Sequence, residues 1–329
     1  MTGRALPGRV LVVGDIVTDV LAAHPAPLAA GADTAARIRV TGGGSAANTA
    51  AWLVAEGVPV ELVGVAGDDA AGEERLVELS RTGVDCARVR RAPGAATGCV
   101  VVLVTGDERT MLSDRGANAL LRPDDVDAPV RDPDVIHVHV SAYVLLDPVT
   151  RAAGRHALTT ARELGRTTSV GAASAVALRA VPDFNDLVRG VDLLLCNADE
   201  ARALLRRPAS GGDSLEALAA AVSAHVRHAV VTSGRAGAAW ATGGATAARA
   251  AGKAVDVVDA TGAGDAFAAG VLAGFVAGVD PPTALRTGTE RGAAAVTRLG
   301  ARPPGLRREA APIGARHRRG SGMICRRRR

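Results

Sequence analysis

Strand-like and helix-like segments alternate along most of this chain, and this rhythm limits the fold more than any other feature. Short apolar runs have the composition of buried strands, and the segments between them have the apolar spacing of helices. The predicted strands are residues 10–13, 60–65, 135–140, 168–170, 193–196 and 229–232, and the predicted helices are residues 50–56, 72–82, 148–164 and 215–225. Such alternation predicts an α/β fold of three layers, in which helices cover both faces of a mostly parallel central sheet.

The composition agrees with a domain of this kind. The chain has 329 residues, a size at which α/β folds commonly form one domain, and 48% of its residues are hydrophobic. Only 2% are aromatic, so the core must be aliphatic and rich in alanine. No apolar run reaches the ~18 residues that a membrane span needs, and the N-terminal segment lacks a secretory signal pattern. We therefore expect a cytoplasmic protein without a membrane partner.

The excess positive charge lies at the C-terminal end. Residues 306–329 contain nine arginines and one glutamate, a net charge of +8, while the whole chain carries +5 and residues 1–305 therefore carry −3. We expect 306–329 to be a disordered basic tail. Because this tail has no interleaved aromatic residues, it does not favour a nucleic-acid partner. The single lysine, Lys253, lies in no GK[ST] sequence, which excludes a Walker A phosphate loop.

The most specific motif is a glycine-rich turn at residues 259–265, with the sequence Asp-Ala-Thr-Gly-Ala-Gly-Asp. It follows a strand-like apolar run at 254–258 and begins a long helix of small residues at 266–278. A glycine turn at a helix start exposes several backbone N–H groups, and the helix dipole adds partial positive charge. Such a turn can bind an anion without any lysine. Asp265 ends the turn, although acids are also common in the first turn of helices for structural reasons alone.

A second glycine turn, at residues 42–44, begins another helix, and Gly-Val-Ala-Gly-Asp-Asp follows at 64–69. Together these regions resemble the two signatures of the ribokinase-like (PfkB) family of carbohydrate and nucleoside kinases. The downstream turn resembles the family's DTxGAGD motif, with Ala260 where threonine is usual. The resemblance runs from about Gly14 to about Pro304. It implies ATP-dependent phosphorylation of a hydroxyl group on a small sugar or sugar derivative, with ATP and Mg²⁺ as cofactors.

The resemblance also implies roles for individual residues around the phosphoryl group and the sugar. Asp265 would be the catalytic base for the sugar hydroxyl. The backbone N–H groups of three residues would form the anion hole, namely Gly262, Ala263 and Gly264. The residues that would bind the sugar are Asp19, Gly43, Gly44 and Asn48. The chain departs from the family's pattern at Val17, where asparagine is frequent, and at Gly171, where aspartate is frequent.

Three further groups of residues would serve the nucleotide and its metal ions. Asn197 and Glu200 match an NxxE motif tied to Mg²⁺ and phosphate, although the same pair is a common helix cap. Thr232, Gly234 and Gly237 match a nucleotide-contacting turn, and a simple hairpin turn explains these glycines equally well. The residues that stand where many relatives hold a monovalent cation such as K⁺ are Asp259, Thr261, Ala295 and Gly300.

The resemblance assigns residues 1–305 to one kinase domain with a small β lid over the sugar site. The lid segments would be residues 31–41 and 90–114, and the second of these contains a predicted hairpin of 98–104 and 109–113.

Two alternatives stay open. A nucleoside kinase on the same fold would need apolar surface for the base, and the scarcity of aromatic residues favours sugars only modestly. A non-catalytic sugar-binding protein would not need the base at Asp265. The expected partners are a small sugar and ATP, and association into a homodimer also stays open.

Overall fold

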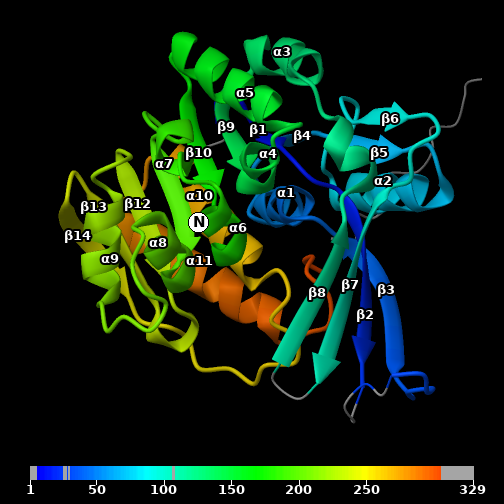
Figure 1. Ribbon diagram of the computed structural model, residues 1–329. Coiled ribbons are helices and arrows are strands. Elements are labelled where there is room, and N and C mark those ends of the chain that lie inside the picture. The colour runs from blue at the N-terminus through cyan, green and yellow to red at the C-terminus, as the bar shows by residue number, and fades with distance from the viewer. Residues whose placement is uncertain (1–5, 25–27, 29, 106–107, 305–329) are drawn as a thin grey trace, which may run out of the picture.

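The computed structural model describes residues 6–24, 28, 30–105 and 108–304 (Figure 1). Within them, the strands of the central sheet are β1 (Arg9–Val13), β4 (Val60–Val63), β9 (Val135–Ser141), β10 (Thr167–Gly171), β11 (Leu193–Asn197), β12 (His228–Thr232), β13 (Ala238–Thr242) and β14 (Ala245–Ala250). Their spatial order is β14-β13-β12-β11-β10-β9-β1-β4. The strands from β12 to β4 run parallel, while β13 and β14 are antiparallel at one edge. The predicted mostly parallel sheet is therefore confirmed.

Helices cover both faces of this sheet, as predicted. One face carries α1 (Ser45–Ala55), α2 (Ala70–Thr82), α10 (Ala263–Val276) and α11 (Pro281–Val296). The other face carries α3 (Pro123–Arg131), α4 (Ala142–Leu146), α5 (Arg151–Glu163), α6 (Ala175–Ala180), α7 (Phe184–Leu187), α8 (Ala198–Leu204) and α9 (Leu215–Val222). Each face has its own cluster of buried valine, leucine and alanine side chains, which is the aliphatic core that the composition implies.

Helices α10 and α11 pack unusually closely because glycines meet at their contact. A Cβ atom added to Gly270 would lie 2.9 Å from the backbone of Gly288. Both helices therefore need glycine at this crossing, and the close packing fixes the start of α10 relative to the sheet.

A second sheet, which we call the lid sheet, extends away from the central body on the right of Figure 1. Its strands are β2 (Val17–Ala23), β3 (Arg37–Gly43), β7 (Gly98–Thr105) and β8 (Glu108–Asp114), in the order β3-β2-β7-β8. The predicted hairpin is the β7–β8 pair. The sequence analysis did not identify β2 as a strand of this sheet.

One predicted lid segment is partly wrong. Residues 90–92 form β6 (Arg90–Ala92), which pairs with β5 (Val65–Gly67) in a separate two-stranded sheet. Arg90 also bonds to Asp125 at the start of α3, which holds β6 against the central body. The lid sheet therefore takes only β7 and β8 from this segment.

The strand predicted at residues 254–258 is also wrong. These residues form no strand, and Val257 and Val258 are more than half exposed. The backbone N–H groups of Val258 and Asp259 bond to the Val296 carbonyl at the end of α11 instead of to a neighbouring strand. The apolar character of this run has another use, because Val255 and Val257 line a cavity described below.

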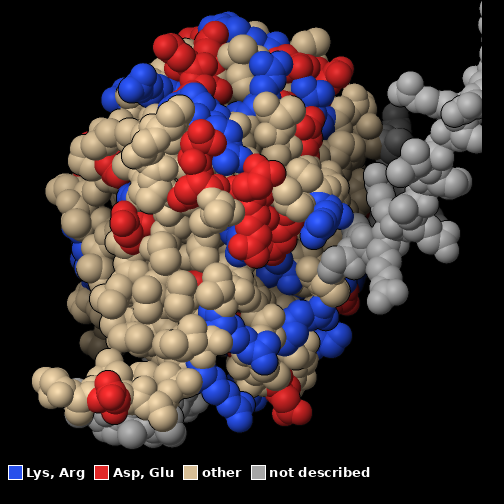
Figure 2. Space-filling model, turned by 90° about the vertical axis from the view of Figure 1, so that its right-hand side faces the viewer, with Lys and Arg blue, Asp and Glu red and all other residues tan. Residues whose placement is uncertain are grey.

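The surface of the described residues carries mixed charge. Figure 2 shows acidic side chains gathered over the face where α2 lies, and arginines below them where β3 runs. The predicted tail at 306–329 lies outside the described residues. No helix among the residues that the structure describes is long and apolar enough to cross a membrane.

Candidate active site

Two adjoining cavities lie where the predicted site residues meet. The first, of about 450 Å³, lies between the carboxyl ends of the central strands, the starts of α1 and α10, and the lid sheet. The second, of about 260 Å³, lies beside the β12–β13 turn and the start of α10. Thr232, Gly264 and Phe267 line both cavities, so the two are neighbours. This position agrees with the rule that ligands of open α/β sheets bind beyond the carboxyl ends of the strands.

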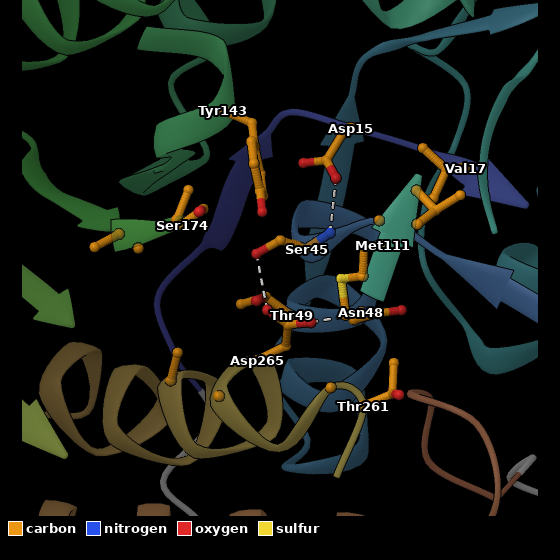
Figure 3. Close-up of a pocket in the computed structure, with 18 of the residues that line it drawn as sticks. Asp15, Val17, Ser45, Asn48, Thr49, Met111, Tyr143, Ser174, Thr261 and Asp265 are labelled. Carbon is orange, nitrogen blue, oxygen red and sulfur yellow. Dashed lines mark hydrogen bonds between the residues drawn. The ribbon is translucent and has the colours of Figure 1, made fainter. Parts of the chain in front are cut away.

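Asp265 lies in the first turn of α10 and points into the first cavity (Figure 3). Gly262 caps this helix in the left-handed conformation with φ 74°, and a Cβ atom there would lie 2.5 Å from Ala301. Two residues of α1 hold the carboxylate in place. Ser45 Oγ donates a hydrogen bond of 2.8 Å to Asp265 Oδ1, and Asn48 Nδ2 donates one of 2.9 Å to Oδ2. The two glycine turns therefore meet at this carboxylate.

The surroundings of Asp265 raise its pKa to about 7. The main cause is burial, the hydrogen bonds from Asn48 and Ser45 oppose it, and the negative charges of Asp15 and Asp19 add to it. A carboxylate with a pKa near neutral pH can take up a proton during a reaction far better than an ordinary aspartate. The geometry therefore suits general-base chemistry.

The start of α10 offers backbone donors beside this base. The first amides of a helix have no intrahelical acceptor, so those of the predicted anion hole face outward from Gly262, Ala263 and Gly264. The Ala263 amide also makes a long contact of 3.4 Å with the Ala260 carbonyl. Gly262 and Gly264 line the first cavity, while Ala263 and Gly264 line the second. An anion at this turn would thus lie where the two cavities meet.

The predicted sugar-binding residues lie together on the floor of the first cavity. Asp19, Gly44 and Asn48 line it, and Gly43 lies directly against Asp19, because a Cβ atom on Gly43 would overlap the Asp19 carboxyl group. Asn48 is 3% exposed, and its Oδ1 has no hydrogen-bond partner among the described residues. A buried acceptor of this kind needs a donor, and a ligand hydroxyl can supply one.

Burial raises the pKa of Asp19 to about 6, against the opposing charge of Arg302. At neutral pH the group is therefore mostly ionised, which is the form that accepts hydrogen bonds from hydroxyl groups.

The structure adds residues that the sequence analysis did not assign. Ser45 lies inside the second glycine motif, so its hydroxyl could have been predicted as a contact of Asp265. Asp15 follows β1 and accepts hydrogen bonds from the Ser45 amide (2.8 Å) and the Ala46 amide (3.4 Å), so it caps α1 from another element. Tyr143 lines the same cavity, and burial raises its pKa to about 12.

Asn197 and Glu200 form the predicted helix cap at the start of α8. Asn197 Oδ1 accepts from the Glu200 amide, and Glu200 Oε2 accepts from the Asn197 amide, each at 2.9 Å. Glu200 also lines the first cavity, and its pKa is raised to about 7, mainly by burial and further by the charge of Asp265. Two neighbouring carboxylates that resist ionisation would both be stabilised by a bound cation.

Three of the four residues predicted for a monovalent cation are joined by hydrogen bonds. Asp259 Oδ1 accepts from the Thr261 amide (2.9 Å) and hydroxyl (2.7 Å), and Oδ2 accepts from the Gly300 amide (3.0 Å). Ala295 is buried in α11. In the described structure the Asp259 carboxylate thus holds the glycine turn in shape, whatever else it binds.

The second cavity lies beside the turn that was predicted to contact the nucleotide. Gly234 and Gly237 lie on its wall at the β12–β13 turn, as predicted. The only lysine of the chain, Lys253, lines it together with Arg235. Aliphatic residues also line it, namely Val255, Val257, Ala293 and Val296. An apolar slot with two cations beside it suits a base with attached phosphates.

Comparisons with known proteins agree with this geometry. An ATP-dependent ribose-1-phosphate kinase of Halopiger xanaduensis is 34% identical over 299 residues, which cover 89% of this chain and 94% of that protein. A 2-dehydro-3-deoxygluconokinase of Thermoproteus tenax is 33% identical over 252 residues, covering 74% of this chain and 75% of that protein. The crystal structure of an adenosine kinase from Sinorhizobium meliloti superposes with a TM-score of 0.79 at 25% identity, covering 90% of this chain and 96% of that one.

The model of the pfkB family of carbohydrate kinases matches residues 8–307, which include both glycine turns and every residue placed in the two cavities. The family resemblance seen in the sequence is thereby confirmed over the whole fold, and the chain belongs to the PfkB family of carbohydrate kinases.

Proposed function

We propose that this protein transfers the terminal phosphoryl group of ATP to a hydroxyl group on a small sugar or sugar derivative. The observation that carries the proposal is the position of Asp265. Its carboxylate lies between a glycine turn that can hold an anion and a polar floor that includes Asp19 and Asn48. This is the arrangement that phosphoryl transfer to an alcohol requires, namely a base beside the acceptor and donors beside the moving phosphoryl group.

In this mechanism Asp19 and Asn48 hold the sugar so that one hydroxyl group lies at Asp265. As the oxygen of that hydroxyl forms its bond to phosphorus, its proton passes to the Asp265 carboxylate, and the bond from phosphorus to the leaving oxygen of ADP breaks. The charge on the moving phosphoryl group is met by the backbone donors of Gly262, Ala263 and Gly264. Ser45, which bonds to Asp265 Oδ1, keeps the base oriented.

Thr232, Gly234 and Gly237 would contact the nucleotide in the second cavity. Glu200, with Asn197 as its cap partner, would hold Mg²⁺ through water, because carboxylate and water oxygens are the ligands that Mg²⁺ prefers. When bound, the metal ion supplies positive charge to the phosphate oxygens. A K⁺ ion held near Asp259 by carbonyl groups of the turn, with Thr261, Ala295 and Gly300, is the corresponding proposal for monovalent activation.

A specific observation favours a nucleoside as the second candidate acceptor. Four apolar side chains of the lid sheet form part of the wall of the first cavity, namely Val17, Val100, Val102 and Met111. In Figure 3, Val17 and Met111 lie on the side opposite Ser174. Aliphatic side chains can pack against a base, so this wall compensates for the scarcity of aromatic residues.

We also propose that the protein is cytoplasmic and forms a homodimer through the outward face of the lid sheet. Side chains alternate along strands, so the residues on this face are those that do not line the cavity. Three of them are large, apolar and mostly exposed, namely Ile38 (66%), Val40 (58%) and Leu112 (57%). An exposed apolar sheet face is typical of a protein–protein contact. Sedimentation of the wild type against a variant with both Ile38→Lys and Val40→Lys tests this, since only the wild type should sediment as a dimer.

The experiment that tests the function is ADP release with three acceptors that share one ring: ribose, ribose 1-phosphate and adenosine. Release that depends on one of these acceptors, and that Asp265→Asn removes, supports the kinase. Binding of an acceptor without ADP release would indicate the non-catalytic sugar-binding alternative. The ranking of the three acceptors then decides between a sugar and a nucleoside.

A further inference from the structure

Arg302 is a buried arginine that lies directly beneath the floor of the first cavity. It is 8% exposed although it is close to the end of the described chain. Its Nη2 donates a hydrogen bond of 3.1 Å to the Gly43 carbonyl, and its Nη1 lies 3.1 Å from Glu78 Oε1. A Cβ atom on Gly42 would overlap the guanidinium group. The arginine is therefore pressed against the backbone at the Gly42–Gly43 end of β3, which is a strand end and not the turn predicted from the sequence.

Asp19 lies on the opposite side of this strand end. The β2–β3 register pairs Val17 with Gly43 and Asp19 with Thr41, and the Asp19 carboxyl group occupies the space where a Gly43 side chain would begin. Two glycines thus separate a guanidinium group from a carboxylate. Side chains at positions 42 and 43 would push the Arg302 guanidinium group and the Asp19 carboxylate apart. This gives a physical reason for glycine at both positions.

The charges around Asp19 leave Arg302 as its main positive neighbour. The negative charges of Asp15 and Asp259 oppose the ionisation of Asp19. The positive charge of Arg302 favours this ionisation more strongly than that of Arg75 does. Arg75 bonds to Glu74 at 2.7 Å and lies 3.6 Å from Glu78.

Glu78 is the one carboxylate that ion-pairs with Arg302 among the described residues, and it is shared with that second arginine. The Arg302 Nε is buried without a hydrogen-bond partner in the same part of the chain. The charge of Arg302 is therefore only partly neutralised by its own contacts.

The backbone on the N-terminal side of Arg302 is fixed by two distant elements. The Gly300 amide donates to Asp259 Oδ2 at 3.0 Å, and Trp52 Nε1 donates to the Ala301 carbonyl at 2.9 Å. Residues 300–302, which we call the strap, thus connect the turn before α10 with α1 and with the end of β3. A side chain held in this way loses little additional entropy when it positions another group.

We propose that Arg302 is a positioning residue for the acceptor, which fixes the Gly42–Gly43 end of β3 from below and supplies the positive charge opposite Asp19. This inference rests on the proposed role of Asp19 in binding the acceptor. Without Arg302, the pKa of Asp19 would rise above about 6, because a cation beside an aspartate commonly lowers its pKa by 1–3 units. Asp19 would then be protonated over more of the neutral range and would accept hydroxyl groups less well.

The test measures acceptor binding in the Asp265→Asn background, where the catalytic carboxyl group no longer titrates and no turnover occurs. The probe is whichever of ribose, ribose 1-phosphate and adenosine the wild type phosphorylates, and its Kd is measured by calorimetry from pH 5.5 to 8.5. Adding Arg302→Met should weaken acceptor binding about tenfold or more at pH 7. It should also raise the pH midpoint at which affinity is lost on acidification by about one unit. Adding Arg302→Lys should restore the pH midpoint but not the full affinity, because lysine keeps the charge without the planar contact.

The matched control is Arg291→Met in the same background. Arg291 is also paired with a glutamate, Glu56, whose side chain is 6% exposed, but Arg291 lines neither cavity. Its removal should leave the acceptor Kd and its pH midpoint unchanged, and the Kd for ATP should stay within twofold in every variant.

A merely structural role for Arg302 would appear as a lower Tm or weaker ATP binding with the pH midpoint unmoved, and this result would overturn the proposal. If Arg302→Met does not fold, the lysine variant alone decides, since an unchanged acceptor affinity there also contradicts it. Failure of the proposed function would look different, because the wild type would then phosphorylate no acceptor.

Discussion

Replacing Asp265 by asparagine should inactivate the enzyme and stabilise it at the same time. The carboxyl group is held between Ser45 and Asn48 with a pKa raised from 3.8 to about 7. Loss of a general base alone commonly lowers turnover ~10²–10⁴-fold, and we expect kcat to fall within that range. Asparagine keeps one oxygen that can accept a bond from either neighbour, so the local geometry should survive.

The gain in stability follows from linkage. Because the folded pKa lies above the unfolded one, the ionised carboxylate destabilises the fold, and the wild type loses stability as pH rises from about 4 through 7. A rise of about 3 units corresponds to about 4 kcal/mol at 1.36 kcal/mol per unit. The group faces a cavity, so we halve this to about 2 kcal/mol. For a domain of this size that is a Tm increase of roughly 3–6 °C at pH 8.

The assay compares Tm values at pH 5 and pH 8 without ligands, together with ADP release at saturating acceptor. The variant should exceed the wild type in Tm at pH 8, and the difference should shrink at pH 5. Asp199→Asn is the matched control, because Asp199 lies on the surface with its side chain 73% exposed and should show no such pH dependence. An equal Tm difference at both pH values, or retention of more than about a tenth of wild-type kcat, would refute the reasoning.

Three further predictions concern the surroundings of this base. Gly43→Ala should raise the acceptor KM at least about tenfold and leave the ATP KM unchanged in steady-state assays, because the added Cβ atom would displace the Asp19 carboxyl group. The control is Gly212→Ala, which should change neither KM, because a Cβ atom there meets nothing within 4 Å. Glu200→Gln should raise the Mg²⁺ concentration needed for half-maximal activity by about tenfold, as a magnesium titration will show. Trp52→Phe should lower the unfolding free energy by about 1 kcal/mol in urea, because the indole donates a buried hydrogen bond of 2.9 Å to the strap.

The layers of the fold and the centre of the site could be predicted because their signals are local. The spacing that indicates a strand or a helix can be recognised in consecutive residues. A glycine turn before a helix likewise predicts free backbone N–H donors at the start of that helix. Asp265 and Asn48 were both predicted, and the structure brings them within 2.9 Å. The direct bond between them could not be predicted, since it joins residues 217 positions apart.

The remaining features depend on contacts that leave no local trace. Strand β2 was missed because its sequence lacks a clear alternation of apolar and polar residues, and only its pairing with β3 and β7 makes it a strand. The apolar run at 254–258 has the composition of a strand but lies beside a cavity rather than beside a partner. Arg302 lies in an ordinary arginine-containing segment, and only the fold places it beneath Gly43, 259 positions away.

The strap also sets the order in which this enzyme can become active during its synthesis. The sheet strands and α1 leave the ribosome early, and domains generally begin to fold from their N-terminal side. The acceptor floor, however, is completed by residues 300–302, among the last that the structure describes. A nascent chain can therefore assemble most of its core while the proposed acceptor site still lacks its support. Translation that stops before residue 300 would yield a largely folded protein without a finished site.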